Sequence, residues 1–406
     1  MTAEVAAIVL EDNRLQALAL SIAERGGAQA TGSYVRLVEA LEDRGYLDRR
    51  TEGIADGASL VRRANDGQGL MRPELAVLLS SSKLVLQDAI EGSPLPEDPA
   101  LERELFAAFP EPMRKKFKGE IEGHRLRREL IATKLSNLII NRMGVSHPFE
   151  LVEEEGVTLA QVASAFVAAD RLFDLPALFE RIEETPMDEK ARLELFDRVA
   201  WAIRTHIADL LRSGGGDCHP SELVKKLSPG ITKLDKAKQR LLAEEGKAYS
   251  NRIRTKLSEA GAPSELVEEI AELFELDGAV GLVQLACDSD VQPVQLTKAF
   301  IQLGRELGLD WAQTTASQMN PSDPWERLLV AGLAQDFQHM RLAFLRRVGR
   351  GKLAKDPVKA VDNWSDKHAP AIAQFRAMVG RAQNAVPVTA PMLAQIASQA
   401  RNLLLR

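Results

Sequence analysis

The sequence is poor in cysteine and has no long apolar run. It contains 2 cysteines in 406 residues, Cys218 and Cys287. Two cysteines are too few for a disulfide framework and fit a reducing compartment. No stretch approaches the ~18 consecutive apolar residues of a membrane span. The first residues include Glu4 and no basic segment before an apolar run, so a signal peptide is not expected. We therefore expect a cytoplasmic protein with no membrane partner.

Sequence motifs for catalysis, cofactor binding and metal binding are also missing. Gly67 and Gly69 supply the first two glycines of a dinucleotide-binding fingerprint, but Arg72 stands where the third belongs and no apolar strand precedes them. The six histidines form no metalloprotease pair, and Cys218-His219 has no second pair at zinc spacing. No phosphate-loop lysine or nucleophile-elbow serine occurs. We predict no catalytic, cofactor-binding or metal-binding residue in this chain.

The composition favours helices over strands. Alanine and leucine dominate, whereas aromatic residues make up only 5% of the chain. Alanine and leucine are good helix formers, and aromatic and β-branched residues favour strands. The apolar stretches 283–286 and 386–388 are too short to indicate a sheet. We predict an all-α fold, a multi-helical array of roughly 15 to 20 helices without a Rossmann domain.

Glycine and proline divide the chain into segments. A capping-box pattern at Thr158-Gln161 predicts a helix start, and the glycines at 214–216 indicate a loop after a helix end. Apolar residues at helical spacing, such as Leu75, Leu78, Leu79 and Leu86, indicate buried faces. The predicted helices include 1–25, 33–44, 73–91, 101–109, a long basic helix that follows Pro112 and ends at Arg142, 193–211, 233–254, 325–347 and 389–404.

A faint internal repeat has a constant offset of 134 residues. Residues 162–167, with Arg171 and Leu175, match residues 296–301, with Arg305 and Leu309. A longer predicted helix follows each copy. Duplication explains the matches, and so does convergent patterning of two alanine-rich helices. The predicted helical units are 1–145, 146–212 and 218–406, and under duplication the third is a diverged copy of the second.

A basic run between residues 114 and 128 has three interpretations. It could bind nucleic acid, form an interface with acidic residues of another domain or subunit, or be a solvated face with local ion pairs worth ~0.5 kcal/mol each. The net charge of −6 and the single interleaved aromatic residue, Phe117, disfavour nucleic acid. The basic residues are Arg114, Lys115, Lys116, Lys118, Arg125, Arg127 and Arg128.

Two stretches carry a resemblance to a known family. Gly69–Leu79 reads GLMRPELAVLL, and Ile121–Thr133 reads IEGHRLRRELIAT. Both resemble the C-terminal region of the large bacterial NAD-dependent glutamate dehydrogenases, as does Asp12–Ser21. The likeness is most specific over residues 8–180. Members of that family are several times longer than this chain, so the resemblance implies a C-terminal piece that lacks the catalytic lysine and aspartate segments.

The resemblance also implies a role. The parent enzyme would oxidise L-glutamate to 2-oxoglutarate and ammonia with NAD as cofactor, and this chain, which we expect to be inactive alone, would brace, oligomerise or regulate the catalytic domain of the same parent chain. A homo-oligomer is expected. The alternative is a free-standing helical interaction protein that binds nucleic acid through residues 114–128. The candidate interface residues in the quoted motifs are Arg72, Glu74, His124, Arg125, Arg127 and Arg128.

Overall fold

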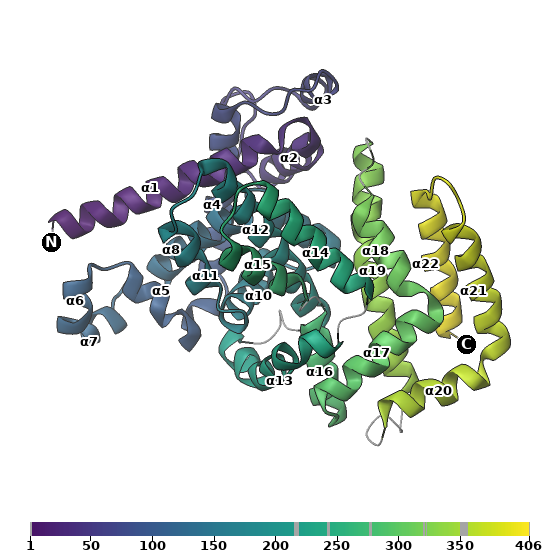
Figure 1. The fold of residues 1–406 in the computed structure, drawn as a ribbon. Coiled ribbons are helices and arrows are strands. Elements are labelled where there is room, and N and C mark those ends of the chain that lie inside the picture. Colours follow the sequence, from purple (N-terminus) through teal and green to yellow (C-terminus); the bar gives the residue numbers. More distant parts are fainter. Residues whose placement is uncertain are drawn as a thin grey trace. The chain divides into compact units, whose positions relative to one another are not determined.

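The computed structural model describes residues 2–214, 219–241, 244–275, 278–319, 321, 323–349 and 356–405. Within these ranges the chain forms 22 α-helices and two short 3-10 helices, and no strand (Figure 1). This confirms the predicted all-α fold. Among the described helices, none has the length and apolar character that a membrane-spanning helix requires.

The chain divides into two compact units, each described here by itself. Unit 1 contains residues 1–225 and 257–270, and unit 2 contains residues 226–256 and 271–406. The predicted boundaries of three helical units stay a prediction. The helices α13 (Pro220–Leu241), α14 (Glu244–Glu259) and α15 (Ser264–Glu275) have residues in both units.

Unit 1 is built around four packed helices, α4, α8, α10 and α12. Leu75, Leu78, Leu79 and Leu86 of α4 are buried there, as the periodicity predicts. The remaining helices of unit 1 surround this core. Its elements are α1 (Thr2–Arg25), α2 (Gly27–Asp43), α3 (Gly57–Asn65), α4 (Arg72–Glu91), η1 (Leu95–Glu97), η2 (Pro99–Leu101), α5 (Glu102–Ala107), α6 (Glu111–Lys116), α7 (Lys118–Glu122), α8 (Arg127–Met143), α9 (His147–Glu155), α10 (Leu159–Leu172), α11 (Leu175–Glu184) and α12 (Glu189–Arg212).

The basic segment is not one helix, and the prediction of a single helix ending at Arg142 is wrong. It forms α6, α7 and α8. Phe117 separates the first two with φ −120° and ψ 36°. Gly123 ends α7, and the His124 ring then accepts a hydrogen bond from the Leu126 N–H at 3.2 Å. Glycine is a poor helix former, and a local bond from side chain to backbone competes with helix continuation.

A second predicted helix, 233–254, is also divided. Its residues fall in α13 and α14, and residues 242 and 243 lie outside the described residues. The predicted loop at 213–217 is described only as far as Gly214. The stretch 283–286 lies within a helix, α16, rather than in a strand.

Unit 2 is centred on α19, which packs against α17, α18 and α22. Phe337 and Phe344 of α19 are fully buried in this core. The helices α20 and α21 complete the unit. Its further elements are α16 (Ala279–Ser289), α17 (Pro293–Leu307), α18 (Leu309–Gln318), α19 (Pro324–Val348), α20 (Pro357–Lys367), α21 (Ala369–Gln383) and α22 (Ala390–Leu405).

The two copies of the sequence repeat have the same succession of helices. The series α9 to α12 matches the series α16 to α19 in order. Positive φ angles fall at matching positions: Gly144 and Gly278, Gly156 and Asp290, and Asp174 and Gly308 are each 134 residues apart. Each of these residues lies at a turn between helices. The matches support a duplication, which stays a prediction.

Candidate interface

The six candidate residues lie in unit 1 in two groups. Arg72 and Glu74 are in the first turn of α4, His124 and Arg125 lie between α7 and α8, and Arg127 and Arg128 begin α8. The structure gives the members of these groups different roles, because some are already bound within unit 1 and others face solvent.

Glu74 is used inside unit 1. Its side chain is only 4% exposed. It accepts hydrogen bonds from the Met71 N–H at 2.8 Å and from both terminal nitrogens of Arg63, at 2.7 and 3.1 Å. Burial alone would raise the pKa of Glu74, but the hydrogen bonds from Arg63 and the backbone lower it. Glu74 therefore caps α4 and attaches it to α3.

Arg72 and Arg128 are also engaged within the unit. Arg72 pairs with Glu24 of α1 at 2.8 Å and donates to the Ala17 carbonyl at 3.3 Å. Arg128 donates to the Ser93 carbonyl at 2.7 Å and pairs with Glu97 at 2.8 Å. It also binds the Glu91 carbonyl at the end of α4, where a cation suits the helix dipole. Both side chains connect elements that are distant in sequence.

His124 supports the turn between α7 and α8. Its ring is half-buried and packs edge-on against Phe109, with centroids 5.7 Å apart. The Nδ1 atom accepts a hydrogen bond from the Leu126 N–H at 3.2 Å. These two contacts, with Phe109 and Leu126, hold the loop in place. Neither partner is a reactive group.

Arg125 and Arg127 differ from the other candidates. Arg125 is exposed and Arg127 half-buried, and no hydrogen bond or ion pair joins either side chain to a described residue. Leu126 between them is 42% exposed. At the end of α6, Lys115 and Lys116 are exposed, with the Lys116 ammonium 5.3 Å from the centroid of Phe117, itself 37% exposed. We call Lys115, Lys116, Phe117, Arg125, Leu126 and Arg127 the basic tip.

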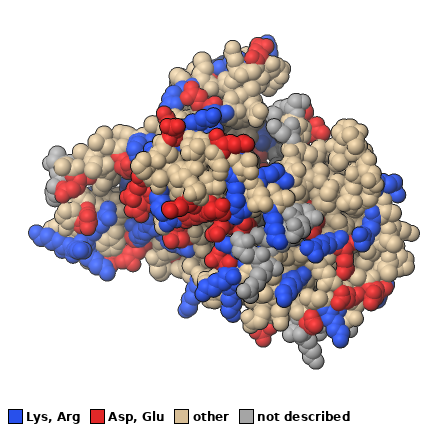
Figure 2. Space-filling model, in the orientation of Figure 1, with Lys and Arg blue, Asp and Glu red and all other residues tan. Residues whose placement is uncertain are grey.

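The basic tip is visible as a surface feature. Figure 2 shows Lys and Arg side chains gathered at its left edge, over α6 and α7. The nearby Lys118 is paired with Glu122 at 3.4 Å, and Arg114 donates to the Phe109 carbonyl at 2.8 Å. These contacts leave Lys115 and Lys116 next to Phe117 in the sequence, and Arg125 and Arg127 on either side of Leu126. The sequence indicated the charge here, but not which of the basic residues remain available.

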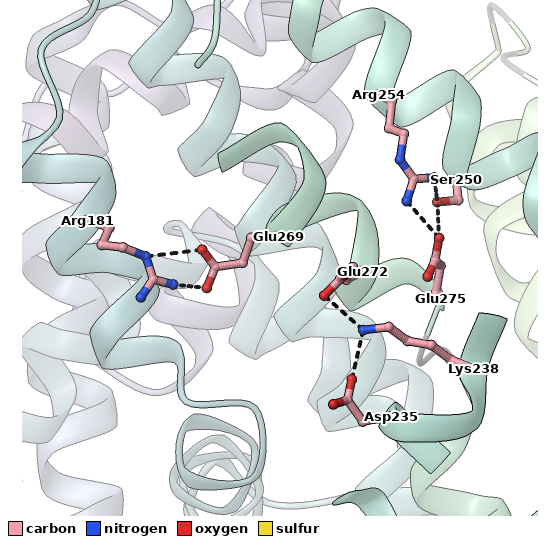
Figure 3. Close-up of polar contacts among 8 residues, drawn as sticks. All are labelled: Arg181, Asp235, Lys238, Ser250, Arg254, Glu269, Glu272 and Glu275. Carbon is pink, nitrogen blue, oxygen red and sulfur yellow. Dashed lines mark hydrogen bonds and ion pairs between the residues drawn. The ribbon is translucent and has the colours of Figure 1, made fainter. Parts of the chain in front are cut away.

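Several basic side chains elsewhere in the described part of the chain pair with acidic ones. In unit 1, Arg181 of α11 pairs with Glu269 of α15 (Figure 3). In unit 2, the Lys238 ammonium lies 2.8 Å from Glu272, and the Arg254 guanidinium lies 2.9 Å from Glu275.

A metal-binding cluster was one further possibility for the part of the chain that the structure describes. No group of three or more histidine, cysteine, aspartate or glutamate residues there could hold a metal ion. Of the pair Cys218-His219, only His219 is described, and its Nδ1 lies 3.5 Å from Asp98. The fold and the basic tip define an all-helical region with a candidate interaction surface.

Comparison with known proteins identifies the family. The family model described as glutamate dehydrogenase, C-terminal, matches residues 67–402. The chain belongs to this family, which confirms the resemblance drawn from residues 69–79 and 121–133.

Three relatives are each named NAD-specific glutamate dehydrogenase. The proteins of Halomonas elongata and Pseudomonas aeruginosa are each 30% identical, over 91% and 93% of this chain. The protein of Mycobacterium tuberculosis is 24% identical over 93% of this chain. The chain covers only 23%, 24% and 23% of their lengths, respectively. It is thus similar to a C-terminal quarter of these relatives.

Proposed function

We propose that this chain is the non-catalytic C-terminal helical region of a cytoplasmic NAD-dependent glutamate dehydrogenase, here called the parent dehydrogenase. Its role is to brace the catalytic domain of the same parent chain within a homo-oligomer. The parent reaction is the oxidation of L-glutamate to 2-oxoglutarate and ammonia, with NAD bound by the catalytic domain. Family membership and the coverage of about a quarter of the relatives support this proposal.

The observation that carries the proposal is the basic tip. Four cations that form no ion pair with a described residue lie next to Phe117 or Leu126 in the sequence. Such a surface fits an acidic face with an apolar depression on the catalytic domain. Exposed charges steer association and fix its orientation, whereas buried aromatic and aliphatic side chains contribute more of the affinity. Arg72, Glu74 and Arg128 stabilise unit 1 instead and are left out of the proposed contact.

The first test compares two pairs of charge reversals. The catalytic part of the parent dehydrogenase is titrated with the purified chain, and binding and glutamate-dependent NADH formation are both measured. Arg125→Glu/Arg127→Glu should weaken binding at least about tenfold at low salt, and by less as salt screens the charges. The control is Arg376→Glu/Arg381→Glu, which reverses two exposed arginines of α21 that make no ion pair with a described residue. It should bind as the unaltered chain does.

Three outcomes would contradict the proposal. NADH formation by the purified chain alone would mean that it contains a catalytic site. Equal binding by the two charge-reversal variants would exclude the basic tip as the contact. Tight, salt-dependent binding of single-stranded RNA that Arg125→Glu/Arg127→Glu abolishes, with no binding of the catalytic part, would favour the free-standing nucleic-acid-binding alternative.

A further inference from the structure

The first residues of α1 form an unusual helical segment. Residues 3–10 read AEVAAIVL, with Glu4 as the one charged residue among them. Successive residues of an α-helix are rotated by about 100°, so these eight positions cover the whole circumference. A helix that is apolar on all sides is normally buried. We call residues 3–10 the apolar arm.

The structure leaves most of the apolar arm in solvent, with Glu4 and Ile8 half-buried. Val5 is 49% exposed, Val9 is 53% exposed and Leu10 is 67% exposed. Ala3, Ala6 and Ala7 are exposed as well. Figure 1 shows the arm as the end of α1 that extends beyond the neighbouring helices of unit 1. Scattered exposed apolar residues are common, but a continuous exposed apolar segment marks an interaction site.

The rest of α1 is held firmly, so the arm is presented in a defined direction. Four ion pairs fix α1 to four other helices of unit 1. They begin at the second residue after the arm, and Ala19 and Ala23 are buried beneath the same half of the helix. The pairs are Asp12 with Lys134 at 3.1 Å, Arg14 with Glu183 at 2.7 Å, Glu24 with Arg72 at 2.8 Å, and Arg25 with Glu194 at 2.6 Å.

We propose that the apolar arm inserts into an apolar groove of the catalytic domain of the parent dehydrogenase. This inference rests on the proposed function and adds a second contact, separate from the basic tip. The partner that covers the arm must contact more than one side of the helix. Val5 and Val9 share one face, whereas Leu10 is rotated away from Val9 by about 100°. A groove of a large domain meets this requirement. The relatives have about three quarters of their length outside the matched part to supply one.

Two other binding partners would cover the arm less completely. A second copy packed against one face would leave the opposite face in water. A lipid surface also covers only one side, and interfacial helices usually carry Lys or Arg on their polar face. The charged residues in and directly after the arm are Glu4, Glu11 and Asp12, which anionic lipid would repel.

Photo-crosslinking in the full-length parent dehydrogenase identifies the part of the protein that contacts the arm. Leu10 is replaced by p-benzoylphenylalanine, and the control places the same group at Leu84 of α4, which is 53% exposed. Heavy and light isotope-labelled chains are mixed before irradiation. A crosslink within one chain then joins two peptides with the same label, whereas a crosslink between two chains can join a heavy peptide to a light one. We expect Leu10 to crosslink to the catalytic domain well above the Leu84 control. Crosslinks only to this C-terminal region of a second copy, or a yield equal to the control, would overturn the proposal.

A binding experiment separates this inference from the proposed function. Val5→Glu/Leu10→Glu should weaken binding of the chain to the catalytic part at least about tenfold. The matched control is Val61→Glu/Leu84→Glu, at sites that are 49% and 53% exposed, and should bind normally. Unchanged thermal unfolding of both variants shows that folding is intact. If the arm variant binds normally while Arg125→Glu/Arg127→Glu does not, the arm proposal fails and the proposed function stands. If the unaltered chain never binds, the proposed function fails as well.

Discussion

The guanidinium of Arg142 in α8 lies 3.3 Å from the carboxylate of Asp170 in α10, and the two side chains are 15% and 2% exposed. The same guanidinium stacks over Phe179, 4.3 Å from the ring centroid. Arg171 also contacts Asp170 and pairs with Glu104 at 2.8 Å. Burial lowers the pKa of Arg142 and raises the pKa of Asp170, in each case against the pull of the opposite charge.

This pair leads to a prediction about stability. Asp170→Asn should lower the free energy of unfolding by about 3 kcal/mol, because it leaves the charge of Arg142 buried and uncompensated. The double variant Arg142→Met/Asp170→Leu should recover most of that loss, since no buried charge of the pair remains. Urea unfolding measures both. The control is Asp336→Asn, which removes an exposed pair with Arg401 and should change stability by less than about 1 kcal/mol. Equal losses in Asp170→Asn and Asp336→Asn would contradict the argument.

A second prediction concerns Lys83 of α4, an ammonium group buried in unit 1. Its side chain is 9% exposed, and Nζ has no hydrogen-bond partner among the described residues. Burial lowers the pKa of Lys83 from 10.5 to about 8, although Asp12 attracts the charge. The folded state therefore disfavours the protonated form. Between pH 8 and 10.5 the unfolded chain binds more protons at this site, so stability from this group rises with pH across that window.

Replacing Lys83 tests the sign of this effect. Lys83→Met should raise the free energy of unfolding at pH 7 by about 3 kcal/mol. This figure is the lowering of the Lys83 pKa from 10.5 to about 8, converted at about 1.36 kcal/mol per pKa unit. The advantage over the unaltered chain should shrink as pH rises from 8 to 10. Lys236→Met in α13 removes an exposed lysine and should show no such pH dependence. A gap between Lys83→Met and the unaltered chain that stays constant with pH would refute the interpretation.

Much of the helical core followed from local patterns. The stripe Leu75, Leu78, Leu79 and Leu86 was predictable because helical periodicity depends only on neighbouring residues. The breaks at Phe117 and Gly123 were missed, since lysine, arginine and glutamate around them all favour helix. Tertiary packing and the hydrogen bond from the Leu126 N–H to the His124 ring determine where the helix breaks.

The candidate interface was less accessible to sequence reasoning. The partners of Arg72 and Arg128 are 48 and 31 residues away, and no local pattern indicates such contacts. The apolar arm could have been noticed from residues 3–10, whose apolar character surrounds the helix. The exposure of the arm could not be predicted from the sequence. It depends on which part of α1 contacts other helices, and the ion pairs with α4, α8, α11 and α12 all involve residues 12–25.

The last prediction uses the turn between α17 and α18. Gly308 has φ +71°, and a Cβ atom built there would lie 2.9 Å from a methyl carbon of Val379. Gly308→Ala should therefore lower the free energy of unfolding of unit 2 by about 1 to 3 kcal/mol, through backbone strain and a steric clash. Asp174, 134 residues earlier, tolerates φ 47° at the matching turn, as short polar residues often do.

A matched glycine distinguishes strain from a general effect of alanine. Gly380 lies inside α21, and no described atom would lie within 4 Å of its Cβ beyond the ordinary helix neighbours. Gly380→Ala should raise stability by about 0.5 to 1 kcal/mol, because alanine is the better helix former. Opposite shifts in the urea midpoints of the two variants are expected. Gly308→Asn should lose less than Gly308→Ala, since asparagine adopts positive φ more readily. If alanine is tolerated equally at 308 and 380, the turn does not require its left-handed residue.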